Sequence, residues 1–207
     1  MAEVQPQRPV LLVVAGPNGS GKTELTTNIL DHNWADGCEY INPDFIARDR
    51  FGDWNSPQAV ADAARYATEL RYKLLDEGKS IAFETVFSSG EKVEYVRKAL
   101  AAGYFVRIFF VGTDSPEINA ARVTRRVMEG GHDVPIPKII SRYSKSIANL
   151  AEVLAEVDRA YVYDNSVDDR PAELQFRTRE GAVFKIYSQD HAWARKLYSF
   201  TDDLDQR

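Results

Sequence analysis

The motif GPNGSGKT at residues 16–23 constrains the fold of this chain more than any other feature. It directly follows VLLVVA at residues 10–15, an apolar run that is too short for a helix and typical of a strand buried on both faces of a parallel sheet. The pattern GxxxxGK[ST] between a strand and a helix is that of a phosphate-binding loop, whose backbone N–H groups point at phosphate oxygens. A chance glycine-rich turn is the alternative, but it leaves the register of strand, loop and helix unexplained.

Within this loop, the residue types suit the binding of a nucleoside triphosphate. The glycines allow the backbone to wrap closely around phosphates. Lys22 is expected to neutralise the β- and γ-phosphate oxygens, and the hydroxyl of Thr23 is expected to bind Mg²⁺. The candidate residues for binding ATP are Gly16, Pro17, Asn18, Gly19, Ser20, Gly21, Lys22 and Thr23.

The rest of the chain alternates apolar runs with amphipathic patterns. Further strands are expected at residues 40–41, 80–86, 105–111 and 160–163, with helices at 56–78, 88–103, 115–131 and from about 137. This alternation indicates parallel βαβ units. We therefore predict one α/β domain over residues 1–207 with the fold of P-loop NTPases and kinases: a doubly wound, mostly parallel five-stranded sheet with helices on both faces. A C-terminal β-hairpin and one last helix, at about 172–200, are expected to extend or flank the sheet edge.

Composition excludes several other classes of protein. The chain is 44% hydrophobic and 28% charged, which is typical of a globular protein and excludes collagen-like and disordered classes. No apolar run approaches the roughly 20 residues that span a bilayer, and the first ten residues lack a signal-peptide pattern, so a cytoplasmic protein without membrane contact is expected. The net charge of -5 disfavours nucleic acid as a partner. Cys38 is the only cysteine, which excludes an internal disulfide.

Two carboxylates follow expected strands at the edge where α/β proteins bind ligands. Glu84, at the end of IAFE, is a candidate for binding or orienting the metal, and its alternative is a solvated carboxylate. Asp44, in INPDF, is a candidate general base that accepts the proton of a hydroxyl acceptor, and its alternative is a turn cap. With Thr85, these two residues form the candidate acceptor site.

A basic island lies in this otherwise acidic chain. Between residues 122 and 146 there are six basic residues and two acidic ones, Glu129 and Asp133, so this segment carries net positive charge. The forked guanidinium group of arginine suits contacts with phosphate oxygens, and the glycines at 130 and 131 resemble a hinge. We therefore interpret residues 122–146 as a lid. The alternative is that these residues form a solvated basic face. We expect at least one of the arginines at positions 122, 125, 126 and 142 to contact phosphate. The basic residues are Arg122, Arg125, Arg126, Lys138, Arg142 and Lys145.

Two other polar positions are less informative. His132 lies within the expected hinge and has no visible partner, so we take it as a turn residue without a function. Asn165 follows the fifth expected strand, where a loop would approach the nucleotide base, and it is a candidate nucleotide-binding residue. Ordinary turn chemistry explains Asn165 equally well.

Together these motifs resemble the zeta-toxin-like P-loop kinases, in particular their compact branch. The resemblance runs from the first strand to about Ser166, and its most selective parts are GGHDVP at residues 130–135 and RYxxSxxNL at residues 142–150. It implies a small-molecule kinase that uses ATP and Mg²⁺. It also implies a sugar hydroxyl of UDP-N-acetylglucosamine or another nucleotide sugar as acceptor, and a separate antitoxin protein as partner. By motif position, Lys22 matches the phosphate-binding lysine of the family, Asp44 its base, and Arg126 and Arg142 its lid arginines.

Two other functions remain open from the sequence. One is a regulatory nucleotide-binding ATPase that modifies no metabolite. The other is a kinase acting on nucleic-acid ends, which the acidic balance outside residues 122–146 disfavours.

Overall fold

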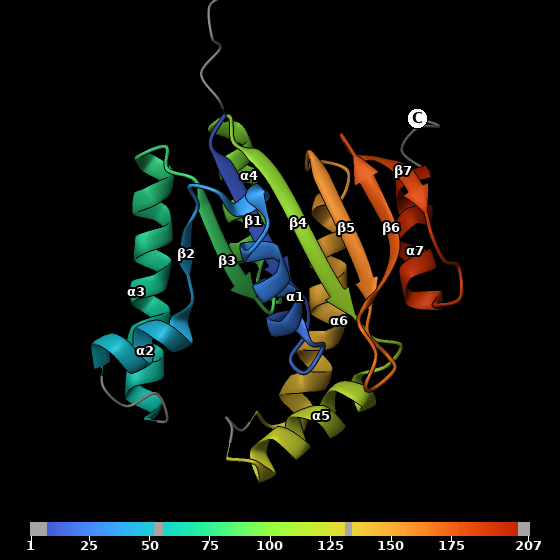
Figure 1. Ribbon diagram of the computed structural model, residues 1–207, viewed down its shortest axis with the longest axis horizontal. Coiled ribbons are helices and arrows are strands. Elements are labelled where there is room, and N and C mark those ends of the chain that lie inside the picture. The colour runs from blue at the N-terminus through green and yellow to red at the C-terminus, as the bar shows by residue number, and fades with distance from the viewer. Residues whose placement is uncertain (1–7, 52–55, 131–133, 203–207) are drawn as a thin grey trace, which may run out of the picture.

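The strands of this protein form one mixed sheet in the order β2-β3-β1-β4-β5-β6-β7 (Figure 1). The computed structural model describes residues 8–51, 56–130 and 134–202, so His132 lies outside the described residues. The strands are β1 (Val10–Ala15), β2 (Glu39–Ile41), β3 (Ile81–Thr85), β4 (Phe105–Gly112), β5 (Arg159–Asp164), β6 (Glu173–Arg179) and β7 (Ala182–Ile186). The helices are α1 (Lys22–Leu30), a short 3-10 helix η1 (Asn33–Ala35), α2 (Pro43–Phe51), α3 (Pro57–Asp76), α4 (Gly90–Ala101), α5 (Pro116–Met128), α6 (Ile136–Val153) and α7 (Ala192–Asp202).

The sheet has seven strands in the described part of the chain, so the predicted number of five is wrong. Strands β1 to β5 pair in parallel as predicted. The hairpin β6–β7 then pairs antiparallel with β5, with Tyr161 opposite Arg177. The physical reason is that β5 would otherwise present an edge of unpaired backbone N–H and C=O groups. Of the two expected places for the hairpin, extension of the sheet edge is confirmed.

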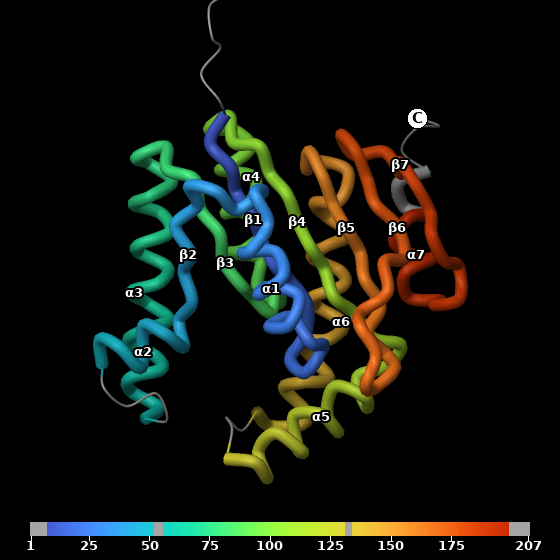
Figure 2. Tube along the Cα trace, in the orientation of Figure 1, coloured from blue at the N-terminus to red at the C-terminus, as the bar shows by residue number. Residues whose placement is uncertain are grey.

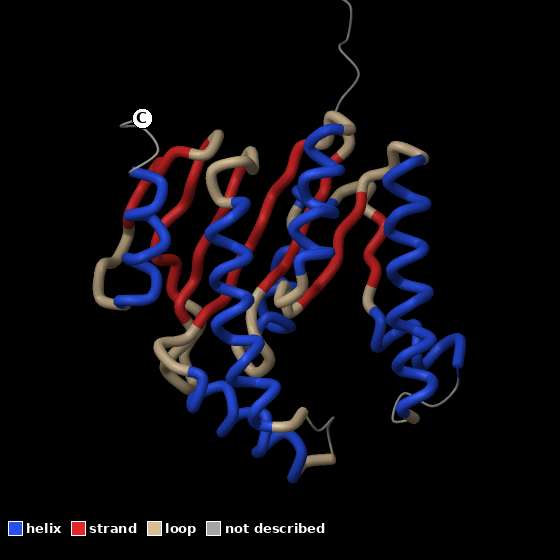
Figure 3. Tube along the Cα trace, turned by 180° about the vertical axis from the view of Figure 1, so that it is seen from behind, coloured by secondary structure: helices blue, strands red, loops and turns tan. Residues whose placement is uncertain are grey.

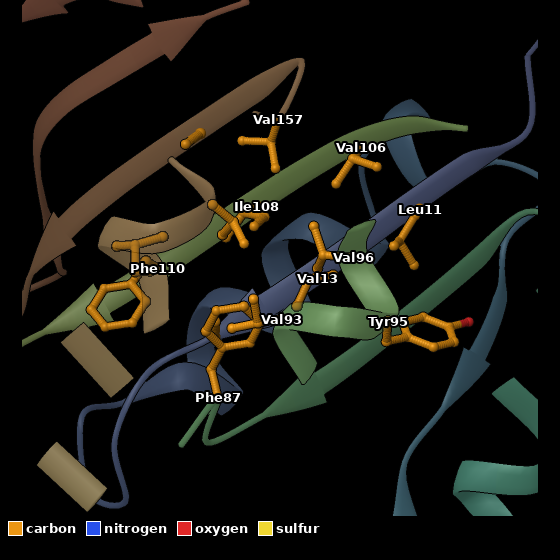
Figure 4. Packing of buried hydrophobic residues seen from close by; sticks show 14 of the residues in the cluster. Leu11, Val13, Phe87, Val93, Tyr95, Val96, Val106, Ile108, Phe110 and Val157 are labelled. Atoms are coloured by element: carbon orange, nitrogen blue, oxygen red, sulfur yellow. The ribbon is translucent and has the colours of Figure 1, made fainter. Parts of the chain in front are cut away.

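Helices cover the two faces of the sheet unequally. On the face seen in Figure 1, α1 and η1 pack through Ile29 and Trp34 on a smaller apolar cluster. Figure 3, the view from behind, shows helices lying across the opposite face. There α3, α4, α6 and α7 contribute to the main core, which Figure 4 shows around Val13, Ile108 and Phe110. Among the described helices, none is both long and apolar enough to cross a membrane.

Helix α3 lies within residues 56–78, where the sequence predicts a helix. The Ser56 hydroxyl accepts a hydrogen bond from the backbone N–H of Ala59 at 3.4 Å, and Pro57 occupies the first turn. Its buried residues recur at three- and four-residue intervals, and one of them is charged: Ala59, Ala63, Ala67, Arg71, Leu74 and Leu75. The apolar stripe of α3 thus contains a buried arginine.

The register of the parallel strands brings the candidate residues together. Ala15 lies beside Thr85, and the backbone N–H of Gly16 donates to the Thr85 carbonyl at 3.2 Å. The start of the phosphate loop is thereby placed next to the end of β3. Figure 2 shows the loop between β1 and α1 at the lower edge of the sheet, close to the chain segments of α5 and α6. The carboxyl ends of the parallel strands form this edge.

Candidate active site

The phosphate loop requires glycine at the positions that the motif specifies. Gly16, Gly19 and Gly21 have φ angles of 148°, 76° and 89°. A Cβ atom would lie 2.2 Å from the Val111 carbonyl oxygen if added to Gly16, and 2.6 Å from the Asn119 carbonyl oxygen if added to Gly19. The loop therefore packs against β4 and α5 so closely that side chains at these two positions would displace backbone.

Three polar side chains hold this loop in place. The Asn165 side-chain amide donates to the Ser20 carbonyl at 2.9 Å, and that of Asn119 donates to the Asn18 carbonyl at 2.6 Å. The Arg142 guanidinium donates to the Asn18 side-chain oxygen at 3.2 Å. Asn165 thus contacts the loop backbone, and its role toward a nucleotide stays a prediction. Asn119 was not identified from the sequence, where its only signal is a polar residue on the buried face of a predicted helix.

Lys22 stands at the centre of the charged groups. Its side chain is 8% exposed, and Nζ donates to the Pro17 carbonyl at 2.9 Å. Burial is the largest cause that lowers the pKa of Lys22, the guanidinium groups of Arg126 and Arg142 also lower it, and the carboxylates of Glu84 and Asp44 raise it. The net result is a pKa of about 8. The structure therefore brings five sequence-predicted residues within electrostatic reach of one another.

The two candidate carboxylates have different surroundings. Glu84, at the end of β3, is half-buried, and one of its carboxylate oxygens accepts a hydrogen bond from the Thr26 hydroxyl at 2.9 Å. Asp44 is exposed in the first turn of α2, and its backbone N–H donates to the Asn42 side-chain oxygen at 2.9 Å. Asn42 thus caps the backbone at Asp44, and Asp44 itself lines the cleft.

The arginines of α5 fall into two groups. Arg126 lines the cleft together with Arg142 from α6. Arg122 donates through Nε to Asp168 at 2.8 Å and through Nη1 to the Asn165 carbonyl at 2.7 Å, and Arg125 contacts the same Asp168. Arg122 and Arg125 therefore tie α5 to the loop after β5.

Most residues of the candidate site line one cleft of about 770 Å³. It lies at the carboxyl edge of the sheet between α2 and α3 on one side and α5 and α6 on the other. The sequence-predicted residues that line it are Asn18, Gly19, Gly21, Lys22, Thr23, Asp44, Glu84, Thr85, Arg126 and Arg142. Asn165 instead lines a neighbouring hollow of about 430 Å³ with Gly21, Arg122 and Asp168. Four polar lining residues were not selected from the sequence: Asn42, Thr68, Arg71 and Lys92.

The residues near Lys22 suit a magnesium ion. Mg²⁺ prefers hard oxygen ligands, and the cleft offers the Thr23 hydroxyl and the Glu84 carboxylate close to the lysine that would meet the phosphates. The chemistry of these donors fits the ion that the phosphate-loop motif implies.

This fold and site define a P-loop protein of the kinase type. The zeta toxin family model matches residues 1–174, which is most of the chain, so the chain belongs to the zeta toxin family. It is 29% identical over 128 residues to an uncharacterized protein of Haemophilus influenzae, covering 62% of this chain and 88% of that protein.

Solved structures share the fold at low sequence identity. A crystal structure of the AvrRxo1-ORF1:AvrRxo1-ORF2 complex with sulphate ions matches with a TM-score of 0.67 and 20% identity over 94% of this chain, which spans 65% of the matched chain. The same complex has been solved with ATP. A structure from the PezAT chromosomal toxin-antitoxin system of Streptococcus pneumoniae matches with a TM-score of 0.60 and 17% identity, covering 98% of this chain and 90% of that one. Family and fold together support an ATP-dependent kinase.

Proposed function

We propose that this protein transfers the γ-phosphoryl group of ATP to a hydroxyl group of a small molecule. The observation that carries the proposal is the setting of Lys22 in one cleft with Asp44, Glu84, Arg126 and Arg142. Phosphoryl transfer depends on positioning and on stabilising charge, and this arrangement supplies a phosphate-binding cation, an acid that can accept a proton, and two arginines.

Each side chain has a task in the proposed reaction. The Asp44 carboxylate accepts the proton of the acceptor hydroxyl and holds that oxygen toward the γ-phosphorus. Lys22 contacts the phosphate oxygens from the loop, and Arg126 and Arg142 meet the transferring group from α5 and α6. The acceptor oxygen forms the new bond to phosphorus as the bond to the β-phosphate oxygen breaks, and ADP leaves with that oxygen.

Thr23 and Glu84 would hold the magnesium ion. When bound, the ion neutralises part of the charge on the phosphate oxygens. Glu84 is steadied for this by the hydrogen bond that it accepts from Thr26. Thr85, the last residue of β3, lines the cleft beside Glu84, and we propose that it contacts the acceptor together with Asp44.

The acceptor that family membership favours is UDP-N-acetylglucosamine or another nucleotide sugar. We also propose that the protein acts in the cytoplasm, where ATP and nucleotide sugars occur together. A separate antitoxin protein is its proposed partner, because one of the solved structures that shares the fold comes from a toxin-antitoxin system.

The test is incubation of the protein with γ-labelled ATP and Mg²⁺, with UDP-N-acetylglucosamine in one sample and a metabolite extract in another. Label on a small molecule is the expected result, and the Asp44→Asn variant should abolish it. Release of labelled inorganic phosphate alone would indicate a regulatory ATPase instead. Label on added oligonucleotide ends, with none on metabolites, would indicate a kinase of nucleic-acid ends.

A further inference from the structure

The face of the sheet that carries α1 and η1 is only partly covered. The buried partners of these two helices lie on β1, β3 and β4, and Figure 1 shows no labelled helix in front of β5, β6 and β7. Helix α7 contributes to the core on the opposite face. Because parallel sheets usually have helices on both faces, the side chains of this open region indicate what else contacts it.

Cations lie side by side in the open region. One row crosses β4, β5 and β6, and a second row follows two residues further along on β6 and β7. Strand partners in register point to the same side of a sheet, so both rows belong to one face. The first row is Arg107, Arg159 and Arg179, and the second is Arg177 and Lys185.

The stacked rings beside these rows identify the face. Tyr161 is in register with Arg177, and its ring stacks on that of Phe109 with 4.8 Å between the ring centres. The Trp34 ring of η1 lies 5.6 Å from Tyr161 and 5.7 Å from Phe109. The two rows of cations therefore lie on the face that α1 and η1 leave partly open.

The described part of the chain offers these cations few anions. Glu180 lies 3.9 Å from Arg159 and 3.8 Å from Arg179. No described carboxylate pairs with Arg107, Arg177 or Lys185, and the buried Nε atoms of Arg107 and Arg177 have no acceptor there. Like charges in register on neighbouring strands repel each other. A polyanion bound to this face would relieve that repulsion.

Aromatic rings lie against the same cations. The guanidinium carbon of Arg177 lies 4.6 Å from the ring centre of Phe184, and the ammonium group of Lys185 lies 4.6 Å from that of Tyr187. Phe184 and Tyr187 are nonetheless 53% and 43% exposed, so each ring keeps one side open to solvent. An open ring backed by a cation is a platform on which a planar group can stack.

Open rings next to unpaired cations fit single-stranded nucleic acid. Such a strand alternates phosphate groups with planar bases, and guanidinium groups match phosphate oxygens while rings stack on unpaired bases. An acidic polypeptide would pair with the cations but would offer the rings few planar groups. The net charge of -5 disfavours nucleic acid for the chain as a whole, whereas this face has five cations and one carboxylate that pairs with them.

We propose that the open face of β4, β5, β6 and β7 is a docking surface for single-stranded nucleic acid. The arginines of the first row contact phosphates, and Phe184 and Tyr187 stack on bases. Arg107 and Arg159 lie near the amino ends of β4 and β5, whereas the phosphate loop lies at the carboxyl edge of the sheet. The docking surface is therefore separate from the proposed active site.

The test measures binding of fluorescently labelled oligouridine and oligodeoxythymidine of about 15 nucleotides by anisotropy. Mg²⁺ and a non-hydrolysable ATP analogue fill the cleft, so that its cations do not hold the oligonucleotide. We expect both strands to bind saturably. Because contacts with phosphates release counterions, affinity should fall at least tenfold between about 50 and 200 mM salt.

Substitutions on the face test the two kinds of contact. Lys185→Glu should weaken binding about tenfold by reversing a charge, and Phe184→Ser should do so by removing a ring. Phe184→Trp keeps a ring and should bind like the wild type. Glu180→Gln should strengthen binding, because it releases Arg159 and Arg179 from their carboxylate partner.

Lys73→Glu is the matched control for Lys185→Glu. Lys73 is exposed on α3, which packs on the opposite face of the sheet, and it pairs with Glu77 at 3.8 Å. This variant changes the net charge of the protein by the same amount, so it should bind the oligonucleotides like the wild type.

Three results would overturn the proposal. The first is absence of saturable binding, or equal weakening by Lys185→Glu and Lys73→Glu. The second is tight binding of polyglutamate that Phe184→Ser does not alter, which would indicate an acidic protein as partner. The third is oligonucleotide binding that occurs only while the cleft is empty, which would place the contact at the phosphate loop. None of these results bears on transfer of the γ-phosphoryl group, so the kinase proposal is tested separately.

Discussion

At the scale of single residues, Lys22 shows how binding function opposes stability. In the folded protein Lys22 is 8% exposed, with two carboxylates and two guanidinium groups nearby. The pKa of Lys22 is lowered from 10.5 to about 8, so the charged form is less favourable in the folded state than in the unfolded state. A phosphate site needs this cation, and the nucleotide-free protein is less stable because of it.

Lys22→Met should therefore raise the stability of the nucleotide-free protein and abolish ATP binding. At pH 7 we expect the free energy of unfolding to rise by about 1–2 kcal/mol, since the variant buries no charge. Between pH 8 and 10.5 the folded wild type releases a proton that the unfolded chain keeps, so the wild type gains stability with rising pH and the difference shrinks. Urea unfolding at pH 7 and pH 10 measures this, and an equal difference at both values would contradict it.

Asp44 is tested by a substitution that keeps its size. Asp44→Asn should retain ATP affinity and lose transfer by on the order of 10² or more, because the amide cannot accept the proton of the acceptor. Binding of an ATP analogue and transfer of label are measured separately. Asp49→Asn is the control: Asp49 lies on the same helix, is exposed, and pairs with Arg48. Equal rates of transfer by Asp44→Asn and the wild type would show that Asp44 is not the general base.

At the scale of elements, the parallel strands and their crossover helices could be predicted because each carries a strong periodic or apolar pattern. Helix α2 was missed because its pattern is weak: Ala47 is its one buried residue in the described part of the chain. Arg71 was missed because the helix expected at residues 56–78 was identified from its overall amphipathic pattern, in which one charged residue on the apolar face does not stand out. A charged residue four positions after Ala67, on the same face, was the available signal.

The pairing of α5 and α6 around the cleft could not be predicted from spacing alone. Arg122, Arg125 and Arg126 are equivalent in sequence. The structure separates them because Asp168 pairs with Arg122 and Arg125, whereas Arg126 lines the cleft, which Arg122 also borders. Such a division depends on where a distant loop packs. The sequence contains no local signal for it.

The two cleft arginines should act on turnover more than on ATP affinity. Arg126→Ala and Arg142→Ala are each expected to reduce turnover by about 10² or more, since arginines on a transferring phosphoryl group act in the transition state. Arg142→Ala also removes the hydrogen bond to the Asn18 side chain, so its ATP affinity should fall modestly. Lys145→Ala, on the exposed side of α6, is the control. Near-normal turnover in both arginine variants would show that these arginines have a structural role and do not act on the transferring group.

At the scale of the whole molecule, the C-terminal residues complete the sheet and its second layer. The Trp193 side chain packs so closely on Gly112 that a Cβ atom there would lie 2.3 Å from the ring, and its indole N–H donates to Asp164 at 2.8 Å. Phe176 and Leu197 join the same core as β1 and β4. We therefore propose that the described chain unfolds as one unit, although the hairpin and helix could be predicted only as neighbours of the sheet edge.

His191 links α7 to the carboxyl ends of β4 and β5, and this contact depends on pH. One ring nitrogen lies 2.9 Å from Asp114 and the other 3.4 Å from Asp164. Burial alone would lower the pKa of His191, but the hydrogen bond to Asp114 and the charges of Asp164, Asp114 and Glu173 together raise it. The folded protein thus holds the proton more tightly than the unfolded chain. The resulting stabilisation is present below about pH 6.5 and is lost as pH rises through the higher pKa of the folded state.

His191→Gln should consequently destabilise the protein in acid more than in base. We expect a loss of up to about 1 kcal/mol at pH 5.5, small because the pair is partly exposed to water, and a smaller loss at pH 9. Urea unfolding at the two pH values measures the difference. Asp114→Asn should show the same trend alone and add little to His191→Gln, because both variants remove one interaction. If His191→Gln has the same effect at both pH values, the ring acts through packing, and its charge does not hold α7 to the sheet.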